Sequence, residues 1–261
     1  MAAARAVARV VAVAALAAAL ARTARAEPVA PPPPSPRVLH VPTAWLIPRD
    51  HVHTSAGVTH RGAIHASVVA GLAGLADVDV TLSDDVGFCD PCAGPRTITP
   101  TWLGSAGFKL AAPAGAWFRA QPALAVGMRR SFAARAPAGS TAAPEVATLF
   151  AVASARAHGV AVHLGASAWA TARGARPPVR PFAGLEWRPP QYPRTTLLGD
   201  LSWLPELGAD GAALRLIAGW GIRYQALSWG AVELAVRHRE DDALAGSTVF
   251  VRVAGSFDLR R

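Results

Sequence analysis

Apolar and polar residues alternate along much of this chain with a period of two, which is the pattern of a β-strand whose two faces meet different surroundings. The clearest segment begins at Leu214, where Trp220, Ile222 and Tyr224 share one parity and Arg223 and Gln225 share the other. A helix would not sort these residues in this way. The pattern therefore predicts a strand with one apolar and one polar face.

Similar segments recur along the chain. The last one sets Val251, Val253 and Phe257 opposite Arg252 and Asp258. The others are 51–61, 63–72, 77–86, 98–110, 119–129, 146–157, 160–172, 185–188, 195–204 and 228–239. Many positions are Ala, a poor strand former. The pattern outweighs this propensity because Ala is tolerable on a lipid face and in a crowded interior, so we predict about twelve strands, within a range of about 10 to 14.

The connections between the predicted segments alternate in length. Those after even-numbered segments are short: 73–76, 111–115, 158–159, 189–193 and 226–227. Those after odd-numbered segments are longer: 87–97, 133–145, 173–181, 205–211 and 240–246, with the first, near 61–62, as the exception. Bacterial outer-membrane barrels have short periplasmic turns and longer outer loops, so the alternation favours such a barrel.

The first 26 residues have the features of a secretory signal peptide. Arg5 and Arg9 precede an apolar run over 10–21, and small residues at positions 24 and 26 predict cleavage before Glu27. The run is too short for a spanning helix, which needs about 20 residues. Residues 27–37 are predicted to be a Pro-rich linker and residues 38–261 the barrel.

Composition narrows the class of protein further. Hydrophobic residues make up 52% of the chain, yet beyond the signal peptide no stretch resembles a spanning helix. An exported, apolar chain without such a helix can satisfy its backbone in a membrane only by closing a β-barrel. Removal of the four signal-peptide arginines would lower the net charge from +9 to +5. The basic residues are spread out and the chain is exported, so a nucleic-acid partner is not expected.

We therefore predict an all-β, antiparallel, up-and-down transmembrane barrel in the bacterial outer membrane, monomeric and surrounded by lipid. The alternative is a soluble, secreted β-sandwich that binds a partner.

Two stretches resemble the opening of porin-like outer-membrane barrel proteins. Residues 42–48 read PTAWLIP, like the lead-in to the first strand, and residues 71–80 read GLAGLADVDV, like the turn between strands two and three. The similarity covers about 40 residues. It implies a barrel with a pore-like or unassigned role and assigns no functional residues. Arg260 and Arg261 stand where many such proteins end in an aromatic residue, and Phe257 is a possible substitute.

Cys89 and Cys92 have the spacing of a redox or metal motif and fall in a predicted outer loop. Position 93 is Ala rather than the His of a haem attachment site, and the chain has no second such pair for a zinc site. A thioredoxin-like centre would need a βαβ setting. We therefore expect a disulfide that closes the loop in an oxidising compartment.

Other signs of chemistry are weak. His51 and His53 share a parity and could together hold a metal ion, but the spacing indicates no carboxylate or Cys partner. We therefore expect imidazoles that line the lumen, and we predict no metal or cofactor. Lipid-hydrolysing barrels use Ser and His oriented by Asn, and this chain has no Asn, although an Asp could replace it. We expect no enzymatic activity.

The polar parity collects more basic than acidic residues. The predicted lumen-lining residues are Asp79, Lys109, Arg119, Arg129, Arg156, Glu186, Arg188, Asp200, Arg215, Arg223, Glu233, Arg237, Arg252 and Asp258. Charges inside a barrel must pair or be hydrated, which leaves two hypotheses. The barrel is either a small pore that prefers anionic solutes or a closed structural barrel braced by ion pairs.

Overall fold

The computed structural model describes residues 34–89, 98–134, 145–171, 178–208 and 211–260. Within these ranges the chain forms twelve strands and one short 3₁₀ helix, η1 (Leu244–Gly246). The strands are β1 (His51–Thr59), β2 (Ile64–Leu72), β3 (Ala76–Cys89), β4 (Ile98–Ala112), β5 (Ala123–Ala134), β6 (Val146–Ala157), β7 (Val160–Thr171), β8 (Val179–Trp187), β9 (Thr195–Gly208), β10 (Gly211–Gln225), β11 (Gly230–Arg239) and β12 (Thr248–Asp258).

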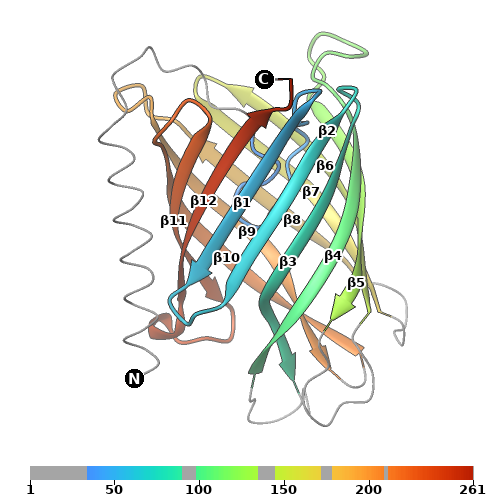
Figure 1. Ribbon diagram of the computed structural model, residues 1–261, viewed down its shortest axis with the longest axis vertical. Helices are drawn as coiled ribbons and strands as arrows, with labels where there is room; N and C mark the ends of the chain where they lie inside the picture. Colours follow the sequence, from blue (N-terminus) through green and yellow to red (C-terminus); the bar gives the residue numbers. More distant parts are fainter. Residues whose placement is uncertain (1–33, 90–97, 135–144, 172–177, 209–210, 261) are drawn as a thin grey trace.

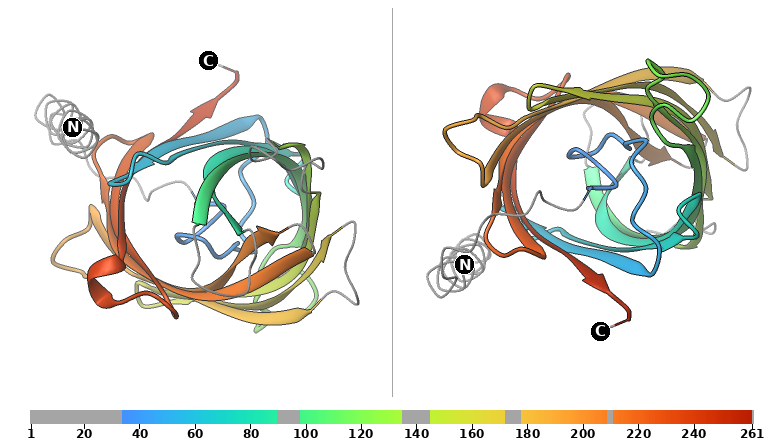
Figure 2. Two further views of the ribbon diagram at one scale, coloured as in Figure 1. Left: turned by 90° about the horizontal axis from the view of Figure 1, so that it is seen from below. Right: turned by 90° about the horizontal axis from the view of Figure 1, so that it is seen from above.

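Each strand pairs antiparallel with its neighbours in the sequence, and β1 pairs with β12 to close the ring. The closing register places Val58 opposite Val251 and His51 opposite Asp258. Figures 1 and 2 show the tilted strands surrounding a central space. The predicted all-β up-and-down barrel of about twelve strands is confirmed. A single closed sheet also excludes the alternative sandwich, which would need two packed sheets.

The two ends of the barrel differ in their connections. At the terminus end, where β1 begins and β12 ends, the connections are 73–75, 113–122, 158–159, 188–194 and 226–229. At the opposite loop end they are 60–63, 90–97, 135–145, 172–178, 209–210 and 240–247. The predicted alternation in length is therefore weaker than expected. The connection predicted at 111–115 occupies 113–122, and most of the loop predicted at 205–211 is strand, because β9 and β10 remain paired as far as Gly208 and Gly211.

The outer face of the barrel is apolar. Large hydrophobic side chains that point outward are about half exposed, among them Val126 (56%), Leu164 (57%) and Ile222 (47%). Many charged side chains on the opposite parity, such as Lys109 and Glu233, are buried. A soluble protein has the reverse arrangement, and an outward apolar band is what a bilayer requires of a barrel. Among the described residues, no helix is long and apolar enough to cross a bilayer.

One strand leaves the ring near the loop end. The pairing of β3 with β4 shifts in register between Ser83 and Val86. Beyond this shift, Gly87, Phe88 and Cys89 pair in parallel with residues 206–208 of β9, although β3 and β9 are not neighbours in the ring. The end of β3 therefore crosses part of the mouth, and Figure 2 shows strand ends inside the ring.

Candidate functional site in the barrel lumen

The chain before β1 lies inside the barrel. Residues 34–50, called the inner segment below, are the blue trace within the ring in Figure 2. The segment folds back on itself, since Val38 N donates to Val41 O at 3.0 Å and Thr43 N donates to Pro36 O at 3.1 Å. The hydroxyl of Thr43 also donates to Ser35 O at 2.8 Å. These local hydrogen bonds form a compact turn that fits within the lumen.

The apolar residues of the inner segment pack against the wall in two clusters. Val41 and Ala44 form one cluster with Ala123, Ala125, Val152 and Phe182, and the partly buried Trp45, Ala111 and Phe150 pack against it. The second cluster joins Val38 and Leu39 to Leu198 and Ala235. The lumen thus contains a small hydrophobic core that the inner segment completes.

Glycines on the wall make room for this segment. A Cβ at Gly184 would lie 2.9 Å from Val38 Cγ2 and 3.3 Å from Val41 Cγ1. A Cβ at Gly71 would overlap the carbonyl oxygens of Ile47 and Pro48. Because backbone oxygens cannot move aside as easily as flexible side chains, larger residues at Gly71 would push the segment away from the wall.

Ion pairs on the wall hold the backbone carbonyls of the inner segment. Glu233 is 1% exposed and accepts hydrogen bonds from Arg223 Nε at 2.6 Å and Arg252 Nε at 2.5 Å. The same guanidinium groups donate to Val38 O at 3.1 and 3.2 Å, and Arg252 also donates to Leu39 O at 3.2 Å. Arg223 forms a second ion pair, with Glu186, at 3.1 Å. Two buried cations are thus neutralised by carboxylates while their remaining donors fix the segment.

Carboxylates on the wall hold the backbone amides of the segment. Asp200 Oδ2 accepts from His40 N at 2.6 Å and Val41 N at 3.1 Å. Asp77 Oδ1 accepts from Ile47 N at 3.1 Å and pairs through Oδ2 with Lys109 at 2.9 Å. Lys109 in turn donates to Trp45 O at 2.5 Å. Asp77 and Lys109 stand close to the ends of β3 and β4 at the terminus end, so their contacts hold the segment near that end of the lumen.

A Ser and His pair supports the segment rather than facing open space. Ser154 Oγ lies 2.7 Å from His163 Nδ1 and accepts a hydrogen bond from Ala44 N at 2.8 Å. Both side chains are fully buried, and the Trp45 ring packs edge-on against the imidazole with centroids 5.8 Å apart. The hydroxyl is therefore committed to the inner segment.

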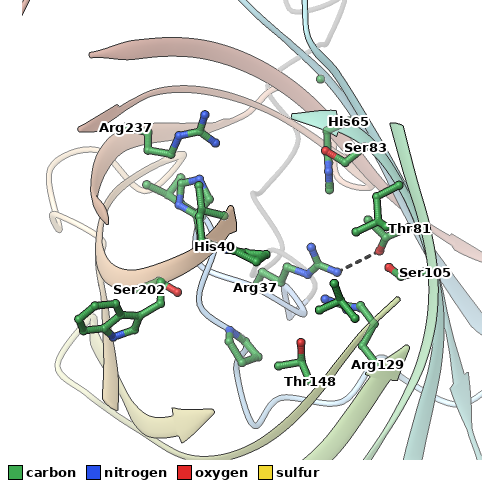
Figure 3. Close-up of a pocket in the computed structure, with 18 of the residues that line it drawn as sticks. Arg37, His40, His65, Thr81, Ser83, Ser105, Arg129, Thr148, Ser202 and Arg237 are labelled. Atoms are coloured by element: carbon green, nitrogen blue, oxygen red, sulfur yellow. Dashed lines mark hydrogen bonds between the residues drawn. The ribbon is translucent and has the colours of Figure 1, made fainter. Parts of the chain in front are cut away.

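A cavity of about 250 Å³ occupies the half of the lumen nearest the loop end. Its floor is the inner segment, which contributes Arg37, Leu39, His40 and Pro42. Figure 3 shows Arg37 reaching to Thr81, with Arg129, Ser105 and Thr148 on the same side and Arg237 and Ser202 across the space. The charged residues that line it among the described residues are Arg37, Arg129, Arg237 and Arg252. Hydroxyl groups also line it, from Thr59, Thr81, Ser83, Ser105, Ser131, Thr148, Ser167 and Ser202. Aromatic and aliphatic side chains complete the lining, among them Phe150, Trp169, Phe182, Trp203 and Phe250.

One carboxylate serves two guanidinium groups beside this cavity. Asp79 Oδ1 lies 2.7 Å from Arg129 Nη2 and 3.9 Å from Arg37 Nη2. Gly107 stands between Asp79 and Arg129 in the register, and a Cβ there would lie 2.8 Å from Asp79 Oδ2.

Most residues predicted for the lumen lie on its polar parity. These are Asp79, Lys109, Arg129, Arg156, Glu186, Asp200, Arg215, Arg223, Glu233, Arg237 and Arg252. Asp258 is the last residue of β12, and Arg188 follows β8, where burial lowers its pKa. Arg119 needs correction: it is exposed in the 113–122 connection, because β5 begins only at Ala123.

Sequence reasoning missed several charged residues of the lumen. Arg37 and His40 come from the inner segment, which has no strand period to place them. Asp77 has the same parity as Asp79, and Glu206 has the same parity as Asp200. Extending the period-two pattern would therefore have placed both on the lumen face. Glu206 pairs with Arg215 at 3.1 Å and also with Arg239.

The cysteine prediction lies outside what the structure covers. Cys92 falls beyond the described residues, and only the backbone of Cys89 is described, so the disulfide stays a prediction. His53 is buried on the lumen face, and His51 Nδ1 lies 3.0 Å from Arg49 O. Within the described ranges, no three His, Cys, Asp or Glu side chains gather in a way that could hold a metal ion.

Comparison with known proteins adds to this geometry. The chain matches no family model and no curated protein. Among solved structures it is similar to the KdgM porin, with a TM-score of 0.53 and 9% identity over 79% of this chain and 99% of the porin. This chain has the fold of an outer-membrane β-barrel. A second structure, the KdgM porin in complex with disordered oligogalacturonate, gives a TM-score of 0.50 and 8% identity over 79% of this chain and 98% of that one.

Outer membrane phospholipase A from Escherichia coli is a more distant match, with a TM-score of 0.41 and 12% identity over 82% of this chain and 92% of the phospholipase. At such identities a likeness shows the fold alone. The activity of this outer-membrane barrel has to be argued from its lumen.

Proposed function

We propose that this outer-membrane barrel admits small anionic solutes into its lumen from the loop end and lets them pass when the inner segment moves. The observation that carries the proposal is the cavity, whose described charged lining consists of four arginines. Guanidinium groups in a low-dielectric wall raise the local concentration of anions and exclude cations. One of the two similar KdgM porin structures is a complex with oligogalacturonate, which is also an anion, and this agrees with the proposal.

The orientation and location follow from the same proposal. Barrels of this type keep both termini in the periplasm, which places the loop end outside the cell. The chain would reach the outer membrane after signal-peptide cleavage and contact lipid through its apolar outer face. We propose a monomer without cofactor and without enzymatic activity, since the buried Ser154 and His163 support the inner segment.

A second candidate function is a closed structural barrel. The inner segment favours it, because the segment lies inside the barrel and is held by several buried ion pairs of the wall. In this case the charges would only brace the wall. The two candidates differ in whether any ion crosses the barrel.

Reconstitution in planar bilayers under a potassium chloride gradient tests the proposal. The expected result is discrete openings whose reversal potential shows preference for chloride. Arg237→Glu should shift the reversal potential towards the cation value, because Arg237 lines the cavity. Arg130→Glu is the matched control, since Arg130 is exposed beside Glu145, outside the cavity lining.

Four results would contradict the proposal. A protein that is soluble after export, or whose gel mobility does not change on boiling, would not be a membrane barrel. A membrane barrel that conducts no ions at any voltage would support the structural role instead. A channel selective for potassium would have the opposite ion preference to the one proposed.

A further inference from the structure

The inner segment contributes a charged side chain to the cavity that it closes. Arg37 Nη2 donates to Thr81 Oγ1 at 3.1 Å, and its guanidinium lies in the cavity lining opposite the wall residues of β11 and β12 (Figure 3). The carbonyl of the same residue accepts from Arg223 at 3.2 Å. The backbone of Arg37 is therefore fixed to the terminus half of the lumen while its side chain belongs to the loop half.

Arg37 and Arg129 carry two positive charges for one neighbouring carboxylate. Arg129 takes the closer position on Asp79, with Nε at 2.9 Å and Nη2 at 2.7 Å from the same oxygen, and Arg37 remains at 3.9 Å. The Arg129 side chain is 30% exposed and the Arg37 side chain 16% exposed, so both can be reached from the cavity. Two guanidinium groups that share one carboxylate leave a site where a second oxyanion gains energy from both.

Hydroxyl groups surround this pair of cations. Thr81, Ser105 and Thr148 lie on the same side of the cavity as Arg37 and Arg129 in Figure 3. A solute with an oxyanion and several hydroxyl groups of its own could use both sets of partners at once, whereas a simple inorganic ion could use only the charges. The cavity volume of about 250 Å³ limits the solute to a small molecule.

We propose that Arg37 and Arg129 form a binding site for a small, hydroxylated organic anion, with Ser105 and Thr148 receiving its hydroxyl groups. The inference deepens the proposed function, because it names the class of solute that the lumen holds and the residues that hold it. Asp79 is the internal competitor: it occupies the guanidinium edges that the ligand carboxylate would otherwise take.

Calorimetric titration of the refolded protein in detergent tests this site with two matched probes. Gluconate and sorbitol have the same carbon chain and differ in that a carboxylate replaces one terminal alcohol. Gluconate should bind at one site per barrel and sorbitol should give no binding heat. Inorganic phosphate should bind more weakly than gluconate because it lacks the additional hydroxyl groups.

Variants locate the site. Arg129→Gln and Arg37→Gln should each lower gluconate affinity by about tenfold or more, the loss expected on removal of a charge-assisted hydrogen bond. Asp79→Asn should instead raise the affinity, because it removes the competing carboxylate and keeps the shape of the side chain. Arg130→Gln, on the outer face of the same strand as Arg129, should leave the affinity unchanged. A heat-dependent gel shift retained by each variant confirms that the barrel is folded.

The inference is overturned if sorbitol binds as well as gluconate, if phosphate binds as tightly, if Arg129→Gln has no effect, or if Asp79→Asn weakens binding. Its failure is distinct from that of the proposed function. Chloride-selective openings without gluconate binding would support the proposed channel and contradict the binding site. Gluconate binding by a barrel that never conducts would support the binding site and contradict the proposed channel.

Discussion

The terminus half and the loop half of the lumen are built from the same twelve strands and differ in what fills them. In the terminus half, Asp77 pairs with Lys109 and accepts a hydrogen bond from Ile47 N of the inner segment, and Asp200 contacts His40 and Val41 of that segment. Glu233 pairs with Arg223 and Arg252, whose guanidinium groups hold the carbonyls of the segment. In the loop half, the described charged side chains that face the cavity are arginines. A polar barrel interior can thus be occupied by a peptide near one end and contain a cavity near the other.

The physical basis of this difference is the backbone of the inner segment. Its carbonyls and amides supply partners that a wall of arginines and carboxylates would otherwise have to find in water or in one another. Beyond the level of Arg37, the wall arginines Arg129 and Arg237 line the cavity instead. If the segment alone creates this difference, its removal should alter the conductance and stability of the barrel. Substitutions on the outer surface of the barrel should alter them less.

Removal of residues 34–50 should have the largest effect. Without the segment, the terminus half would become water-filled, and the barrel should show steady conductance at low voltage where the full chain shows brief openings or none. Planar bilayer recordings measure the change. A heat-dependent gel shift is the control for folding, and a folded deletion variant that conducts no more than the full chain would show that something else closes the barrel.

Glu233→Gln should have the next largest effect, on stability. It removes the counter-charge of Arg223 and Arg252, two buried cations. Breaking a buried pair in this way costs about 3–5 kcal/mol. Denaturant unfolding in lipid vesicles, followed by Trp fluorescence, measures the free energy of unfolding.

The matched control is Glu145→Gln, which affects the exposed pair with Arg130. An exposed pair contributes roughly 0–1 kcal/mol. Equal losses for Glu233→Gln and Glu145→Gln would mean that the terminus half is hydrated and that the segment is loosely seated.

Gly219→Ala should have a smaller effect that is specific to the segment. An added Cβ would overlap Asp200 Oδ1 and would lie 3.1 Å from Leu39 Cδ1. Overpacking of this kind costs about 1–3 kcal/mol. Gly199→Ala is the control, because the nearest atom to its Cβ is a backbone oxygen at 3.9 Å. If both substitutions shift the denaturant midpoint equally, strand propensity rather than contact with the segment determines the cost.

The sequence predicted the wall of the barrel better than its contents. Alternation placed Arg129, Arg223 and Glu233 on the lumen face because period two depends only on neighbouring residues. It also predicted strands around the whole ring, although Ala is frequent. The ends of β9 and β10 were missed because Pro205 and Gly208 read as loop residues, whereas in the structure β9 continues to Gly208.

The inner segment could not be found in the same way. Its position depends on contacts with residues far along the chain, such as Ser154 and Asp200, which no local pattern reveals. Glycines on the lumen parity, including Gly71 and Gly184, were the available signal. A wall position without a side chain implies that another part of the molecule comes close to it.

The separation of these contacts in the sequence also bears on how the protein folds. Leu39 accepts its hydrogen bond from Arg252, 213 residues further along the chain. This hydrogen bond cannot form until the last strand is in place, and contacts of such long range are formed slowly. The contact of Ala44 N with Ser154 Oγ needs only β6. The closing strand therefore completes the seating of the inner segment as well as the ring.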